Sequence, residues 1–82
     1  MKVEVYSIKN DKNYNEGTIN WDGNYFFVDP MDSPLLKNIL ASKVPDIKTE
    51  QLVTAKSNPE AFLQNLHLKY RSAYLRVSKP MN

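Results

Sequence analysis

Few residues of this 82-residue chain have the chemistry of a catalytic or metal-binding site. His67 is the only histidine and cysteine is absent, so a metal site would need carboxylates to complete it. Asp29 and Asp32 flank Pro30, and a carboxylate pair that meets across such a turn can hold a divalent cation. Aspartate before proline is also typical of turns, and aspartate near a helix start interacts favourably with the helix dipole. We take this structural interpretation and predict no metal site and no cofactor.

The motifs of nucleophilic catalysis and of phosphate binding are missing from the sequence. No serine lies in a Gly-x-Ser-x-Gly turn, and no second histidine is present to act as a base. Gly17 and Gly23 are the only glycines, which is too few for a glycine-rich loop that binds phosphate. We therefore predict a protein that is not an enzyme and has no small-molecule substrate.

Near the C-terminus, cations are interleaved with aromatic residues, a pattern that single-stranded nucleic-acid binders use. The net charge of the chain is only +2, but residues 1–42 carry −2 and residues 43–82 carry +4. The candidate nucleic-acid-binding residues are Lys69, Arg71, Tyr74, Arg76 and Lys79. An ordinary solvated surface can carry the same charges, and the aromatic-Gly-aromatic motif of sheet-based RNA readers is absent. Nucleic-acid binding is therefore the second of two functional hypotheses.

The strongest signal for the fold is Asp22-Gly23, which lies between two β-prone segments. Glycine accepts the positive φ of a tight hairpin turn, so we predict a two-residue turn there that pairs Ile19 with Phe26. Alternation then gathers four apolar residues on one face, Ile19, Trp21, Phe26 and Val28. The opposite face would carry Tyr25 and Phe27, together with Tyr6 of the first strand.

Two helix start signals follow the hairpin, at Ser33-Pro34 and at Asn58-Pro59, because each pairs a capping residue with proline in the first turn. We predict one α+β domain over residues 1–77, with a frayed tail at 78–82. Its mostly antiparallel sheet has three strands, at 2–8, 17–21 and 24–28. Two helices follow, at 33–42 and 59–76. The polar, asparagine-rich segment 10–16 is expected to be a loop.

The segment after Asn58 allows a second interpretation. Residues 60–76 contain no glycine, proline or β-branched residue, which favours one continuous helix. The alternating pattern of residues 71–77 would instead end the helix near Lys69 and add a fourth strand. We take the continuous helix, which leaves Leu68 and Leu75 seven residues apart on its outer side.

The heptad spacing of Leu68 and Leu75 indicates a second contact, either with the rest of the domain or with another chain, which would be a protein partner or a second copy. The aromatic face with Tyr6, Tyr25 and Phe27 is the other candidate partner-binding surface, provided that no helix covers it. Our first functional hypothesis is therefore a small, non-enzymatic protein-interaction module, with self-association as one of its forms.

The apolar residues of these elements predict the core. It should contain Val3, Val5, Ile19, Trp21, Phe26, Val28, Leu36, Ile39, Leu40, Phe62, Leu66 and Tyr70. The longest apolar run has four residues, at 25–28, which is far too short to cross a membrane. Because the chain also lacks cysteine and an apolar leader, we expect a cytoplasmic protein without membrane contact.

Overall fold

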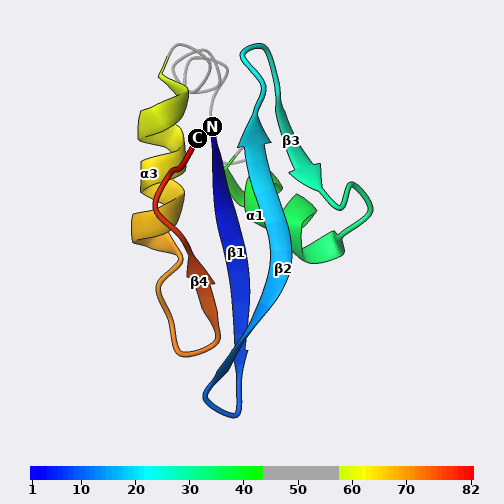
Figure 1. Ribbon diagram of the computed structural model, residues 1–82, viewed down its shortest axis with the longest axis vertical. Coiled ribbons are helices and arrows are strands. Elements are labelled where there is room, and N and C mark those ends of the chain that lie inside the picture. The colour runs from blue at the N-terminus through cyan, green and yellow to red at the C-terminus, as the bar shows by residue number, and fades with distance from the viewer. Residues whose placement is uncertain (44–57) are drawn as a thin grey trace.

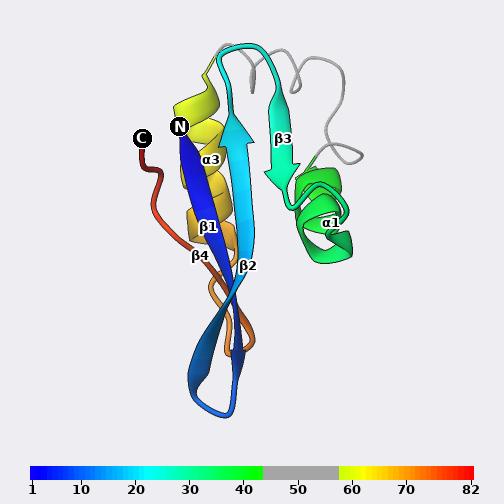
Figure 2. The ribbon, with the colours of Figure 1, turned by 45° about the vertical axis from the view of Figure 1, so that its right-hand side comes forward.

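A computed structural model describes residues 1–43 and 58–82, without the side chains of residues 41–43, and shows an α+β architecture (Figures 1 and 2). Its elements are β1 (Lys2–Lys9), β2 (Lys12–Trp21), β3 (Phe26–Asp29), α1 (Pro34–Lys43), α3 (Pro59–Lys69) and β4 (Leu75–Val77). In this part of the chain the sheet is antiparallel with the order β3-β2-β1-β4. The predicted α+β class is confirmed, and within the described residues the helices are α1 and α3. The predicted three-stranded sheet is wrong, because a fourth strand follows the second helix.

The first two strands form one long hairpin that extends past the ends of both helices (Figure 1). Asn10 and Asp11 have φ values of 52° and 61°, as a two-residue type I′ turn requires, and Lys9 pairs with Lys12 across it. The expected loop at 10–16 is therefore wrong. Asparagine and aspartate tolerate positive φ, so two residues complete the turn and the remaining polar residues continue β2.

A β-bulge interrupts this hairpin midway. Val5 pairs with Gly17, but the next residue of β1, Tyr6, pairs with Asn15, so that Glu16 has no partner of its own in the ladder. Gly17 has a φ of 127°, and its N–H donates to Asn15 Oδ1 at 2.8 Å. The bulge brings the chain close to Asp29, at the end of β3.

The β2–β3 loop has four residues instead of the predicted two. Trp21 pairs with Phe26, and the Asp22 carboxylate accepts hydrogen bonds from the N–H groups of Asn24 and Tyr25 at 2.7 and 2.8 Å. The bond from Tyr25, followed by the bond from Asn24, lowers the pKa of the Asp22 carboxyl. A carboxylate that satisfies two loop N–H groups makes the wider loop favourable.

The wider loop shifts the β2–β3 register by two residues, so that Ile19 pairs with Val28 rather than with Phe26. A shift by an even number leaves every side chain on its original face, because alternation along a strand has a period of two. Ile19 and Val28 are buried, and Trp21 and Phe26 pack against the same core with their ring centroids 4.6 Å apart. The predicted assignment of faces is therefore confirmed, although the pairing was wrong.

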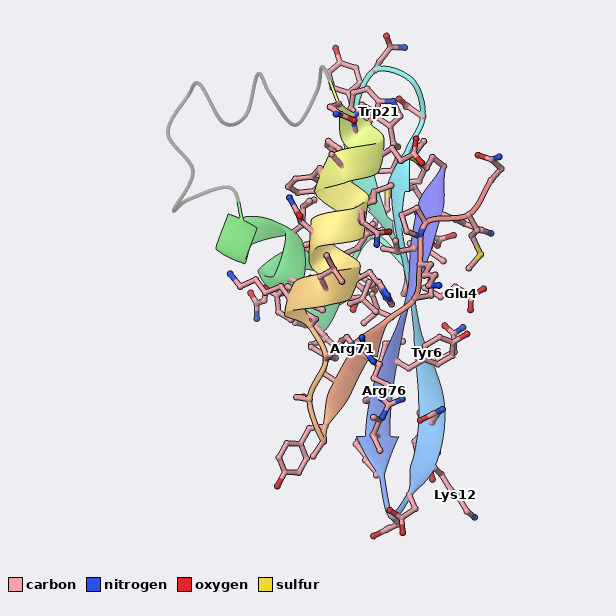
Figure 3. The ribbon with its side chains drawn as sticks, turned by 90° about the vertical axis from the view of Figure 1, so that its left-hand side faces the viewer. Glu4, Tyr6, Lys12, Trp21, Arg71 and Arg76 are labelled. Carbon is pink, nitrogen blue, oxygen red and sulfur yellow. The ribbon has the colours of Figure 1, made fainter. Side chains whose placement is uncertain are left out.

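Both helices pack on this one face of the sheet, which Figure 3 shows nearly edge-on. The buried core consists of Val3, Val5, Ile19, Val28, Leu36, Ile39, Phe62, Leu63, Leu66 and Val77. Four predicted members are only partly buried around it, namely Trp21, Phe26, Leu40 and Tyr70. Leu63 and Val77 are missing from the prediction. The predicted helix ended just before Val77, at residue 76, whereas Val77 lies on β4 opposite Val5.

The continuous helix over 59–76 is wrong, because α3 ends at Lys69 and the chain turns back into β4. The Ser72 hydroxyl accepts hydrogen bonds from the N–H groups of Tyr74 and Leu75 at 3.1 and 3.0 Å. Such local bonds give the backbone an alternative to the helix. The alternative prediction of a fourth strand is right in outline, but β4 covers only Leu75–Val77 of the expected 71–77.

The segment 78–82, which we expected to fray, runs along β1. Ser78 donates its backbone N–H to Glu4 at 2.8 Å, and Lys2 and Met81 exchange two backbone hydrogen bonds of 2.8 Å. These bonds occupy backbone groups of β1 beyond the short β4, so the C-terminal residues extend the edge that β4 begins.

Candidate nucleic-acid interface

The sheet face opposite the helices is covered by neither α1 nor α3. The cross-strand partners on this face are Glu4 and Thr18, Tyr6 with both Asn15 and Arg76, and Asn20 and Phe27. In Figure 3, Glu4 and Tyr6 project from the sheet on the side away from α3. We call this surface the open face, and of the residues that the sequence proposed for binding it carries Tyr6, Phe27 and Arg76.

Tyr6 is held in place on the open face. Its hydroxyl donates to the Glu4 carboxylate two residues away on the same strand. This hydrogen bond is the main cause of a raised pKa for Tyr6, and partial burial and the negative charge of Glu4 raise it further. The bond fixes the orientation of the ring relative to β1.

The raised pKa of Tyr6 predicts a loss of stability at alkaline pH. Because the pKa is higher in the folded than in the unfolded chain, this contribution is complete below the ordinary value of 10.0 and is lost as the pH rises through the folded value. Urea unfolding at a series of pH values should show a steeper alkaline decline for wild type than for Y6F. Y74F removes a tyrosine outside this contact and should keep the wild-type slope. Equal slopes for wild type and Y6F would show that the bond to Glu4 is absent.

Two arginines lie side by side next to Tyr6. Arg71 forms a β-bridge with Arg76, and Arg76 pairs with Tyr6 across β4 and β1. Direct cross-strand partners share one face with their Cβ atoms about 5 Å apart. Both arginines are exposed, and within residues 1–43 and 58–82 neither forms an ion pair with an acid. We call Arg71, Arg76, Tyr6 and Asn15, which are linked by three successive pairings, the Arg–Tyr row.

A second pair of like charges lies at the same end of the molecule. Lys9 and Lys12 are direct partners beside the β1–β2 turn, and both are exposed. The Ile8 N–H donates to the Tyr74 carbonyl at 2.9 Å, which ties the hairpin to the turn before β4. Both turns lie at the lower end in Figure 1. We call Lys9, Lys12, Arg71 and Arg76 the basic end.

The structure brings together only part of the predicted nucleic-acid set. Arg71 and Arg76 are adjacent, and Tyr74 is 78% exposed in the neighbouring turn. Lys69 lies at the end of α3 with its Nζ 5.9 Å from the Tyr70 ring centroid, and Lys79 lies in the C-terminal segment. Sequence analysis missed the contributions of Lys9, Lys12 and Asn15. The turn signal at 10–11 could have revealed the two lysines.

The predicted partner-binding surfaces do not form as proposed. Leu68 is 56% exposed on α3, whereas Leu75 lies on β4 and packs against the core, so the two leucines form no common seam. Phe27 pairs with Asn20, five residues along β2 from the partner of Tyr6, which corresponds to roughly 15 Å. The aromatic residues of the predicted face are therefore two separate groups, with Phe27 and the loop residue Tyr25 at the far end from Tyr6.

His67 has a structural contact. Its Nδ1 lies 2.7 Å from the Val77 carbonyl oxygen and so connects α3 to β4. Among the described residues, no group of three or more histidine, aspartate or glutamate side chains is arranged to hold a metal ion.

Comparisons with known proteins add no functional information. Neither a protein-family model, nor a curated protein, nor a solved structure matches the chain significantly. Among the described residues, neither the helix at 34–43 nor that at 59–69 is long and apolar enough to cross a membrane. Function must therefore be inferred from the surface residues themselves.

Proposed function

We propose that this protein is a non-enzymatic nucleic-acid-binding module that uses the basic end of its sheet. The observation that carries the proposal is the direct pairing of Arg71 with Arg76, without an acid to neutralise either within the described residues. Like charges in direct cross-strand positions repel and destabilise a sheet. Lys9 and Lys12 repeat this arrangement in the adjoining hairpin turn.

A polyanion converts this repulsion into attraction. A phosphate next to two guanidinium groups accepts several charge-assisted hydrogen bonds, and the planar guanidinium fork matches phosphate oxygens better than an ammonium does. An 82-residue domain has little core to offset unfavourable surface contacts. Two pairs of like charges at one end of the domain therefore indicate a ligand that neutralises them, because functional sites commonly cost stability.

The proposal predicts that binding depends on the position of the cations and not only on net charge. Wild type should bind a fluorescently labelled oligonucleotide in an anisotropy titration, with an affinity that falls steeply between low and physiological salt. R71Q/R76Q should weaken binding at least tenfold. It should also reduce the slope of log affinity against log salt by about 1 to 2, because two phosphate contacts are lost.

The matched control is K37Q/K69Q, which removes the same charge from α1 and α3. It should retain most of the wild-type affinity for the oligonucleotide. An equal loss of affinity in both variants would show that binding depends on net charge alone and would contradict the proposal. R71Q/R76Q relieves a repulsion, so its unfolding midpoint should not fall below that of wild type. Unfolding therefore cannot explain a loss of binding by this variant.

A protein-interaction module is the second candidate, supported by exposed apolar residues near β3. Tyr25, Phe27 and Met31 are 65%, 41% and 75% exposed. Sedimentation equilibrium of wild type and F27K tests its homodimeric form, and a monomer at all concentrations of wild type excludes that form. For both candidates we propose a cytoplasmic location, on the composition of the sequence.

A further inference from the structure

We propose that the Arg–Tyr row is a one-nucleotide subsite for a single strand, in which Arg71 and Arg76 hold a phosphate and Tyr6 stacks against the adjoining base. This inference rests on the proposed function and specifies its ligand. Its support is the order of the side chains in the row, the fixed ring of Tyr6 and the position of the Glu4 carboxylate beside it.

The order of the row matches the order of groups in a nucleotide. Arg71, Arg76, Tyr6 and Asn15 occupy consecutive cross-strand positions on one face. Neighbouring strands are about 4.8 Å apart, so the arginines and the tyrosine ring lie within the span of one phosphate and its base. In Figure 3, Tyr6, Arg71 and Arg76 lie at a similar level of the sheet, near β4.

Tyr6 is suited to stacking because it is already oriented. Its hydroxyl is bound to Glu4, so the ring loses little rotational freedom when a base packs against it. Aromatic side chains on a sheet surface stack unpaired bases in this manner, and stacking tolerates any base because each has a π-face. Asn15, the other direct partner of Tyr6, offers an amide that can both donate to and accept from a base edge.

Glu4 gives the subsite a direction. Its carboxylate accepts the hydrogen bond from the Tyr6 hydroxyl and lies two residues from Tyr6 along β1, on the same face but outside the Arg–Tyr row. Its negative charge repels a phosphate placed on that side of Tyr6. The phosphate therefore belongs on the arginine side of Tyr6, towards β4, and the base belongs over β1. Bases within a duplex are paired and stacked on each other, so they cannot lie on this surface, and the subsite requires a single strand.

The test compares two Tyr6 variants by fluorescence anisotropy with labelled single strands of DNA and RNA and with the matching duplex. Y6F keeps the ring but loses the bond to Glu4 that orients it, so it should bind single strands about two- to fivefold more weakly than wild type. Y6L removes the ring and should lose roughly tenfold or more in affinity for single strands, without a change in the salt slope. Neither variant should alter duplex binding, and wild type should prefer the single strand. The DNA and RNA arms show which of the two strands the subsite prefers.

The outcomes separate this inference from the proposed function. Equal binding of single strands by Y6L and wild type, with the salt-dependent loss in R71Q/R76Q still present, overturns the subsite but leaves nucleic-acid binding intact. Absence of oligonucleotide binding by wild type overturns both. Equally tight binding of poly-L-glutamate would assign the arginines to an acidic protein and overturn both as well. Circular dichroism of Y6L and Y6F confirms that each variant is folded before it is compared.

Discussion

Replacement of Gly17 by alanine is expected to destabilise the domain more than any other single substitution of a small residue. A Cβ atom at this position would overlap the carbonyl oxygen of Asp29 and lie 2.7 Å from Leu36 Cδ1 and 2.8 Å from Pro30 Cδ. In addition, residues other than glycine rarely adopt a backbone φ of 127°. The β-bulge therefore depends on glycine both for its conformation and for the close approach of β3 and α1.

The expected cost of G17A is about 3 kcal/mol or more, because backbone strain adds to the displacement of a backbone carbonyl. A domain of this length has a total stability of about 4–12 kcal/mol, so this loss is about a quarter of that stability or more. Urea unfolding followed by circular dichroism measures the effect. A midpoint close to that of wild type would mean that the bulge and the β3–α1 junction are not packed as described.

G23A is the matched control for this experiment. Gly23 also has a positive φ, 103°, but a Cβ atom there would meet no atom within 4 Å. Its substitution includes the conformational penalty and omits the steric one, so the expected loss is about 1–2 kcal/mol. The difference between the two variants isolates the contribution of close packing around Gly17.

The sequence predicted side-chain faces better than it predicted pairing. Ile19 and Val28 were assigned to the core because alternation has a period of two, and the two-residue error in the β2–β3 register left that assignment unchanged. The pairing itself depends on how Asp22 bonds the loop N–H groups, which is a local choice between two turn lengths. Burial patterns along a strand carry no information on that choice.

The end of α3 was mispredicted because intrinsic propensity and tertiary contacts disagree after Lys69. The residues that follow are good helix formers, but burial of Val77 beside Val5 and the turn bonded by Ser72 favour a strand. This error separated Arg71 from Arg76 in the predicted interface, since a helix places residues five apart on different sides. Their pairing, and that of Tyr6 with Arg76, became visible only with the strand order.

L63A is expected to have the second largest effect on stability. Leu63 is fully buried between α3 and the sheet, in the core that also contains Val3 and Val77. Truncation of a buried leucine to alanine removes its packing and leaves a cavity, at a cost of about 2–5 kcal/mol. The urea midpoint should fall accordingly, while the circular dichroism spectrum of the folded state stays unchanged.

L68A provides the same substitution on the same helix at a residue that is 56% exposed. Its cost should stay below about 1 kcal/mol, because little apolar surface is buried there and no cavity forms. The contrast tests which side of α3 faces the sheet. If L68A were the more destabilising variant, α3 would present its other side to the sheet, and the packing that leaves Tyr6 and Arg76 on the open face would have to be revised. The nucleic-acid proposal therefore depends on this pair of stability measurements as well as on the binding titrations.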